Sequence, residues 1–214
     1  MSQKRRAYAG LGIVLVSAIA SVLAYPDLPR QMAIHFSAQG TPDDYLDRPF
    51  AVALLPALEL AMVGMYAVIP RIDPLGENIA DFEDHYDLIA VVTVGILAYV
   101  HGAVLAYNLG YEFQMGQVIA PVLAVVGIVF GTVVENAKQN WFVGIRTPWT
   151  LSNEEVWNRT HERSGILFKI AGLVALLAIP FPGHFELLAI VPLALAALLP
   201  TVYSYVVYRR LNHA

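Results

Sequence analysis

The stretch GQVIAPVLAVVGIVFGTVV at Gly116–Val134 decides the fold class of this chain, because no charged residue interrupts it. A helix needs about 20 predominantly apolar residues to cross the hydrocarbon core of a bilayer. Of all 214 residues, 57% are hydrophobic and only 14% are charged, whereas a soluble domain carries about 25% charged residues. A soluble domain of this size has too small a core for so much apolar surface. The sequence therefore predicts an all-α integral membrane protein.

Six segments are candidate transmembrane helices. They are Ala7–Ala24, Phe50–Ile69, Asp87–Tyr107, Gly116–Val134, Ile166–Phe181 and Phe185–Tyr208. The fifth segment is short, so we expect its helix to begin earlier, in the polar stretch before it. The first segment follows three basic residues as a signal peptide would, but its apolar run is too long for a signal core and lacks a clear cleavage site. The prediction is a single polytopic domain, 1–214, with six transmembrane helices.

Lysine and arginine predict the orientation of this bundle, because cytoplasmic loops carry an excess of them. With a cytoplasmic N-terminus, ten basic residues face the cytoplasm and two face outside. The ten are Lys4, Arg5, Arg6, Arg71, Lys138, Arg146, Arg159, Arg163, Arg209 and Arg210; the two are Arg30 and Arg48. We expect both termini in the cytoplasm. Residues 1–69 then form an N-terminal hairpin with the extracellular loop 25–49, and region 116–214 contains the cytoplasmic loop 135–163.

The cytoplasmic loop contains the polar stretch FVGIRTPWTLSNEEVWNRTH, which begins at Phe142. Gly144 and Pro148 predict an ordered turn in its first part. Ser152 is predicted to begin a helix, in a capping box with Glu155 three residues later. Glu155 also precedes Arg159 by four residues, the favourable order for an ion pair within a helix.

One interpretation of this stretch is an elbow at the membrane surface. The three tryptophans of the chain, Trp141, Trp149 and Trp157, all lie in or beside it, and tryptophan is enriched at the headgroup level. In this interpretation Arg146 contacts lipid phosphate and Glu155 only caps a helix.

The other interpretation is a binding site in which Arg146, Glu154 or Glu155, and His161 converge. Helical spacing places Glu154, Trp157, Asn158 and His161 on one face. Arg146 lies within the turn Gly144–Pro148, which fixes where its planar guanidinium points. We expect a carboxylate, that of Glu154 or Glu155, to hold it.

The run NWFVGIRTPWTLSNEEVWNRTH at Asn140–His161 closely resembles the signature of the SdpI-type immunity protein family. Upstream, the motif residues Leu28-Pro29, Ile34-His35-Phe36, Gly40 and Pro42-Asp43-Asp44-Tyr45 resemble the extracellular-loop motif of an uncharacterised domain that often precedes it. The resemblance implies a polytopic membrane protein and no established catalytic residues. The family's founding member protects a bacterial cell from a secreted killing-factor peptide and holds a transcriptional repressor at the membrane. The candidate ligand- or partner-binding residues are His35, Tyr45, Asn140, Arg146, Trp149, Glu154, Glu155, Trp157 and His161.

Glu59, His101 and Lys169 are the candidate intramembrane polar residues of the predicted helices. Glu59 lies midway along the second helix, where a charged side chain costs about 2.5–3.5 kcal/mol. It should therefore face the bundle, with His101, Lys169 or a trapped water as its partner. The alternatives are a neutral, hydrogen-bonded His101 and a Lys169 whose amine reaches the cytoplasmic headgroups.

The sequence indicates no cofactor, metal site or enzyme motif. The predicted topology places His35 and His161 on opposite sides of the membrane, and the spacing of His161 from the glutamates is not that of a zinc-binding helix. The acidic stretch from Asp73 to Asp87, which includes Glu77 and Asp81, matches no calcium loop and is predicted to be solvated. Without a basic tract, nucleic acid is not expected as a direct partner.

The predicted function is that of a non-enzymatic immunity or signal-coupling factor in the cell membrane. Its expected partners are the lipid bilayer, an extracellular peptide ligand and a cytoplasmic regulator. Two alternatives remain open: a small proton-linked transporter with Glu59 as the titrating group, and an intramembrane hydrolase that uses glutamate and histidine of the motif.

Overall fold

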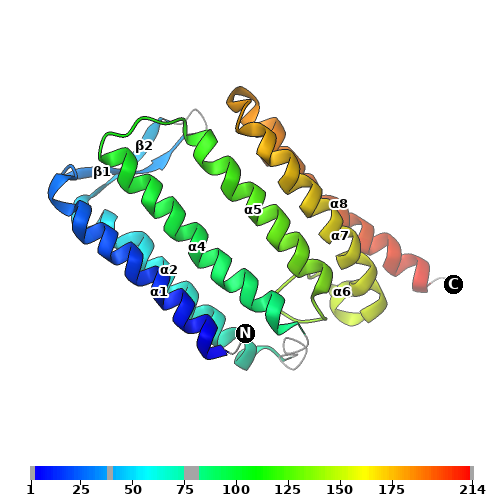
Figure 1. The fold of residues 1–214 in the computed structure, drawn as a ribbon. Coiled ribbons are helices and arrows are strands. Elements are labelled where there is room, and N and C mark those ends of the chain that lie inside the picture. Colours follow the sequence, from blue (N-terminus) through cyan, green and yellow to red (C-terminus); the bar gives the residue numbers. More distant parts are fainter. Residues whose placement is uncertain (1–2, 38–40, 75–81, 213–214) are drawn as a thin grey trace. The chain divides into compact units, whose positions relative to one another are not determined.

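The computed structural model describes residues 3–37, 41–74 and 82–212, and the described chain is mostly helical (Figure 1). The motif residue Gly40 and the acidic residues Glu77 and Asp81 lie outside these ranges. The chain forms two compact units. The first unit comprises Met1–Ala67 and Ala90–Ile119, and the second comprises Val68–Ile89 and Ala120–Ala214.

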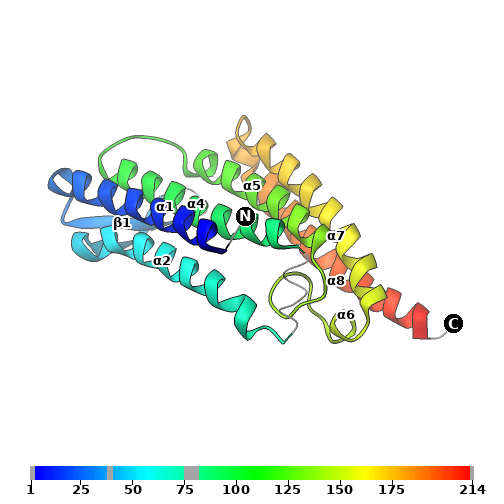
Figure 2. The same cartoon turned by 60° about the horizontal axis from the view of Figure 1, so that its bottom comes forward.

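Three long helices build the first unit: α1 (Gln3–Ala24), α2 (Arg48–Ile72) and α4 (Glu83–Asn108). They lie side by side in both views (Figures 1 and 2). Many of their large apolar side chains are exposed, such as Leu15 of α1 at 60% and Leu60 of α2 at 52%. Apolar residues exposed along a long helix fit a lipid environment, since each one in water would be unfavourable.

A β-hairpin follows α1 and the short 3₁₀ helix η1 (Tyr25–Asp27). Strand β1 (Gln31–Phe36) pairs antiparallel with β2 (Pro42–Asp47), and a bulge interrupts the register after Ala33. The hairpin is fastened to α4, because the side-chain amide of Asn108 accepts from the backbone nitrogen of Ala33 at 2.9 Å and donates to its carbonyl at 3.0 Å. The chain is mostly helical, as expected, and this loop adds one small two-stranded sheet that was not predicted from the sequence.

The second unit is built from α5 (Met115–Asn136), α6 (Pro148–Ser152), α7 (Glu154–Ala175) and α8 (Val191–Asn212). Short 3₁₀ helices η2 (Leu176–Ala178) and η3 (Pro182–His184) and the π-helical turn η4 (Glu186–Ile190) connect α7 to α8. Glycines let α5 and α7 meet backbone to backbone. A Cβ atom at Gly127 would lie 2.7 Å from the Cα of Gly172, and one at Gly131 would lie 2.7 Å from the carbonyl oxygen of Gly165.

Five helices of the described chain are long and apolar enough to cross a membrane, and four of them correspond to the first four predicted spans. The fifth lies at Glu186–Leu211 and corresponds to the sixth predicted span. The predicted span Ile166–Phe181 is not among them. As expected, its helix begins earlier, at Glu154, but the added turns are rich in charged residues, which lowers the hydropathy of α7. The orientation of the termini stays a prediction.

Candidate functional site

The turn that follows α5 is organised by the side chain of Asn140, which is completely buried. Its Oδ1 atom accepts from the backbone nitrogens of Phe142 (2.9 Å) and Val143 (2.6 Å). Its amide nitrogen donates to the carbonyl oxygens of Lys138 (2.8 Å) and Val143 (3.0 Å). Asparagine suits this role because one planar amide can both accept from and donate to a tight turn. Asn140 therefore shapes the backbone and has little capacity left for a ligand.

Gly144 lets the turn approach α7. Its φ is +121°, a conformation that residues with a Cβ atom rarely adopt. A Cβ atom at this position would lie 2.3 Å from Nε2 of His161. Glycine is thus required here both by the backbone conformation and by the lack of space.

His161 is 1% exposed and uses both of its ring nitrogens inside the protein. Nε2 accepts from the backbone nitrogen of Ile145 at 3.0 Å, and Nδ1 lies 2.8 Å from the carbonyl oxygen of Trp157. Since a carbonyl only accepts, we assign the ring proton to Nδ1. Burial lowers the pKa of His161 to about 4, although the hydrogen bond to the Trp157 carbonyl opposes the shift. A neutral histidine without a free nitrogen is neither a general base nor a metal ligand.

Trp157 completes the contact between the turn and α7. Its indole is completely buried and stacks on His161, and its Nε1 donates to the carbonyl oxygen of Ala137 at 2.8 Å. Gln139 fastens the same turn to α6 by donating to the carbonyl oxygens of Thr150 (2.7 Å) and Leu151 (2.8 Å). We call Asn140, Gly144, Trp157 and His161 the motif core, because their contacts shape the turn and hold it against α7.

Ser152 was predicted to begin a helix, but the helices of this region begin at Pro148 (α6) and at Glu154 (α7). A capping box is present at the start of α6, where the side-chain hydroxyl of Thr147 accepts from the backbone nitrogen of Thr150 and that of Thr150 accepts from the backbone nitrogen of Thr147. Helix α7 is capped by Asn153, whose side chain accepts from the backbone nitrogen of Val156 at 3.1 Å. Since Ser152 ends α6, the predicted capping box between Ser152 and Glu155 is wrong.

Trp149 fastens α6 to α8. Its Nε1 donates to the hydroxyl of Ser204 at 2.6 Å, and its rings lie edge-on to Tyr205, with ring centroids 5.2 Å apart. An indole between two helices of one unit is held by protein contacts. A freely exposed headgroup anchor is thus a poor description of this tryptophan.

The charged residues of the motif lie on its exposed surface. Arg146 donates to the carbonyl oxygen of Trp141 at 2.7 Å, so the predicted carboxylate partner is wrong. Glu155 instead pairs with Arg159 at 2.6 Å, as the spacing of four residues predicted. Glu154 is exposed, away from the buried His161. The residues expected to converge on one site are therefore divided between a buried core and an exposed surface.

The two ends of the acidic stretch from Asp73 to Asp87 are less solvated than predicted, whereas Glu83 and Asp84 within it are exposed as expected. Asp73 is 7% exposed and Asp87 is 3% exposed. Asp73 accepts from the backbone nitrogen of Trp141 at 3.0 Å and so belongs to the support of the motif turn. The prediction of a solvated side chain is therefore wrong for Asp73 and Asp87, because position in the fold and not charge alone decides burial.

The candidate residues of the hairpin lie on its exposed surface. Tyr45 is 52% exposed, and His35 pairs with Asp43 across the hairpin at 2.6 Å. This pair is exposed to solvent and contributes little to stability. Both residues are accessible to a molecule outside the protein.

The intramembrane polar residues have partners that the sequence did not identify. Glu59 is completely buried and accepts from the hydroxyl of Ser17 at 2.9 Å. His101 is hydrogen-bonded in the bundle, as one alternative held, with Ser21 as its partner at 2.8 Å. Lys169 forms an ion pair with Glu135 of α5, so a headgroup contact was the wrong alternative. Serine in a transmembrane helix carries little signal of its own, which is why both hydroxyls were missed.

No group of three metal-ligating side chains occurs within residues 3–37, 41–74 and 82–212.

Sequence reasoning also missed Gln139 and Thr150, although both lie in or beside the recognised motif. The helix-contact glycines carried a visible signal, since Gly127 and Gly131 are spaced as in a G-x-x-x-G packing motif. The described contacts of the motif indicate a rigid support that presents exposed residues.

Comparison with known proteins adds three findings. Residues 136–204 match the SdpI/YfhL protein family, and residues 12–60 match a domain of unknown function, DUF1648. The protein named Immunity protein SdpI of Bacillus subtilis (strain 168) is 27% identical over 202 residues, which are 94% of this chain and 94% of that protein. No solved structure matches the chain. The resemblance drawn from the motif at Asn140–His161 and from the upstream motif is confirmed.

Proposed function

We propose that this chain, which matches the SdpI/YfhL protein family over residues 136–204, is an immunity-type protein of the cell membrane. The observation that carries the proposal is the extent of the likeness to the immunity protein of Bacillus subtilis, 94% of both chains. Likeness over nearly the whole length includes the hairpin, the apolar helices and the motif. A shared motif on an unrelated scaffold would support the proposal far less.

In this proposal the hairpin contacts an extracellular peptide. Tyr45 supports this role because an exposed tyrosine offers a large, rigid contact area at low entropic cost. Asp44 and Asp47 of β2 are exposed as well, and their carboxylates favour a peptide with positive charge. The hairpin is a stable platform for binding, because Met32 of β1 is completely buried and packs with Val52 and Val104.

The motif would present a surface to a cytoplasmic regulator. Its core is fully occupied by internal hydrogen bonds, which leaves the exposed side chains for recognition. Trp141 is 50% exposed, and Arg146, which donates to its carbonyl oxygen, is exposed beside it. Glu154 and Glu155 are exposed as well. An exposed tryptophan and arginine are the residue types enriched where partners bind most strongly. The motif core would thus hold this surface in one conformation.

A hydrolase is the function least supported by this geometry. Proton transfer needs a side chain within hydrogen-bond reach of the substrate, and the only histidine of the motif, His161, has both nitrogens occupied. The glutamates of the motif are exposed and do not converge on it.

The test is growth of a Bacillus subtilis strain that lacks its own immunity protein and is exposed to its secreted killing-factor peptide. Expression of this chain is expected to restore growth. Tyr45→Ala should abolish protection at an unchanged protein level. The matched control is Tyr111→Ala, because Tyr111 is also exposed, at 66%, but lies outside the hairpin.

Two outcomes would contradict the proposal. Cells that contain the wild-type chain in their membrane and still die would argue against protection from this peptide. Full protection by Tyr45→Ala would argue against the hairpin as the contact surface. The regulator is tested separately with Arg146→Ala, which should leave the protein in the membrane and abolish crosslinking of a cytoplasmic protein to the motif surface.

A further inference from the structure

The first unit contains buried polar side chains from all three of its helices. Ser17 and Ser21 lie one turn apart on α1, Glu59 lies on α2 and His101 lies on α4. The hydroxyl of Ser17 donates to Oε1 of Glu59 at 2.9 Å, and that of Ser21 lies 2.8 Å from Nε2 of His101. All four side chains are at most 6% exposed. Polar residues are unfavourable inside a membrane protein unless they have a function or a partner.

The hydrogen positions at His101 follow from its neighbours. The hydroxyl of Ser21 lies 2.9 Å from the carbonyl oxygen of Val52, and it must donate there because a carbonyl only accepts. Its oxygen therefore accepts from Nε2 of His101, which carries a proton. The other nitrogen, Nδ1, is buried and has no hydrogen-bond partner in the part of the chain that the structure describes. A neutral imidazole with its proton on Nε2 accounts for these contacts.

Glu59 has one occupied and one unoccupied oxygen. Oε1 accepts from Ser17, whereas Oε2 is buried and lacks a hydrogen-bond partner among the described residues. Within the described part of the chain, no cationic side chain pairs with Glu59. An ionised carboxylate at this depth would be an uncompensated charge, and a buried group in that situation binds a proton instead. The proton belongs on Oε2, because Oε1 already accepts from the hydroxyl.

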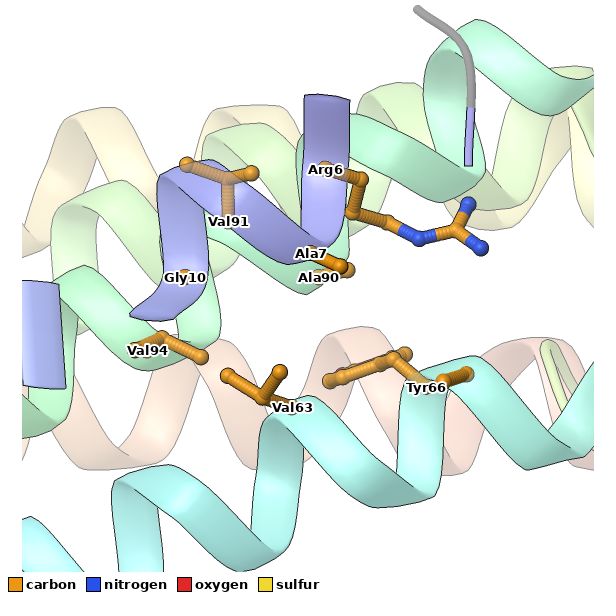
Figure 3. A pocket seen from close by; sticks show the side chains of 9 residues that line it. Arg6, Ala7, Gly10, Val63, Tyr66, Ala90, Val91 and Val94 are labelled. Atoms are coloured by element: carbon orange, nitrogen blue, oxygen red, sulfur yellow. The ribbon is translucent and has the colours of Figure 1, made fainter. Parts of the chain in front are cut away.

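A small cavity lies between the same three helices. Its volume is about 20 Å³, which is enough for about one water molecule. Figure 3 shows Gly10, Val63 and Val94 around the cavity, and Arg6 and Tyr66 toward the right of the view. Val63 is one turn from Glu59 along α2. The polar cluster does not line the cavity itself: Gly10 precedes Ser17 by seven residues, and Val94 precedes His101 by seven. Among the lining residues named here, Val63 is thus the nearest in sequence to Glu59, and the cavity lies toward the N-terminus of α1 from the cluster.

We propose that Glu59 is an intramembrane proton-binding site that exchanges its proton with water in this cavity. On release, the Oε2–H bond breaks, the proton passes to a water molecule, and the remaining carboxylate keeps its hydrogen bond from Ser17. Among the described residues, the ionisable side chains at the cavity are Arg6 from α1 and Tyr66 from α2, and the cluster of Glu59 contains His101 from α4. This proposal is independent of the immunity function, since it concerns one group and its solvent access.

The first test labels the wild-type protein in lipid vesicles at pH 7 with dicyclohexylcarbodiimide, which reacts with protonated carboxyl groups in apolar surroundings. Mass spectrometry is expected to locate the adduct on Glu59. The matched control is Glu135, which is paired with Lys169 and should remain unlabelled. Absence of the adduct from Glu59 in the folded protein would overturn the proposal.

Infrared spectroscopy gives a second test. At pH 7 the wild type should show the carbonyl stretch of a protonated carboxyl group, which Glu59→Gln removes and Glu135→Gln retains. Ser17→Ala should raise its wavenumber, because the C=O group of Glu59 loses its hydrogen bond. Transfer to heavy water should shift the band, and Val63→Leu, which fills the cavity, should slow that shift. A band unaffected by Glu59→Gln would exclude Glu59 as the proton carrier, and an unchanged exchange rate in Val63→Leu would exclude the cavity as the route.

Discussion

The imidazole of His161 lies flat on the indole of Trp157, with ring centroids 3.8 Å apart and ring planes 17° from parallel. The two residues are four apart on α7, and each is also bonded to the polar turn before it, His161 to Ile145 and Trp157 to Ala137. The stacked pair thereby connects one helix to two points of that turn. This arrangement predicts how the second unit responds to substitution and to pH.

Acidification should destabilise the protein through His161. Its folded pKa is lowered to about 4, whereas an unfolded histidine titrates near pH 6.5, so the unfolded chain binds the proton more readily. The stabilisation is present above pH 6.5 and is lost as the pH falls toward 4, by about 3 kcal/mol in total. Thermal unfolding in detergent from pH 7.5 to pH 4 measures it. His161→Asn should be less stable at pH 7.5 and lose less on acidification, and an equal loss in both proteins would contradict this origin.

Gly144→Ala should destabilise the second unit by about 3 kcal/mol, because backbone strain and overpacking both contribute. The new Cβ atom would lie 2.3 Å from Nε2 of His161, at a φ of +121°. Gly110→Ala is the matched control, since Gly110 also has a positive φ, +91°, but open space around its Cβ position. It should cost about 1 kcal/mol from strain alone. Similar unfolding temperatures for the two variants would show that the contact with His161 is unimportant.

Gly127→Ala should weaken the packing of α5 on α7. The atoms nearest to the added Cβ are backbone atoms, the Cα of Gly172 at 2.7 Å and the carbonyl oxygen of Phe168 at 2.8 Å. Because backbone atoms cannot rotate away, the expected cost is about 1–3 kcal/mol. Gly64→Ala in α2, where nothing lies within 4 Å, should instead be neutral or stabilising by up to about 1 kcal/mol. Thermal unfolding of both variants measures the difference, and an equal unfolding temperature for Gly127→Ala and Gly64→Ala would contradict the close contact of α5 with α7.

The topology predicted from basic residues can be tested with single cysteines, since the chain contains none of its own. Cysteine at Ser37, beside the hairpin, should react with an impermeant thiol reagent in intact cells. Cysteine at Ser152, at the exposed end of α6, should react only after the cells are permeabilised. The reverse pattern, or equal labelling of both, would refute a cytoplasmic motif.

The sequence by itself determined the features that depend on local pattern. Long apolar runs were sufficient to locate the first four predicted spans and the sixth, because a membrane span requires only length and hydropathy. The backward extension of α7 and the pairing of Glu155 with Arg159 were predictable because helical spacing brings residues four apart together. The family signature was legible as well, since it is a continuous run of letters.

Tertiary structure alone decided which polar residues are buried and with what partners. Ser17 meets Glu59 across 42 positions, and Trp157 meets Ala137 across 20. No local periodicity encodes such pairs, since they depend on which helix faces approach one another. His161 and Glu154 looked equally able to bind a ligand, yet one is buried with both nitrogens occupied and the other is exposed. The physical reason is that a polar side chain takes its role from the groups that satisfy it, and most of those groups lie far away in the sequence.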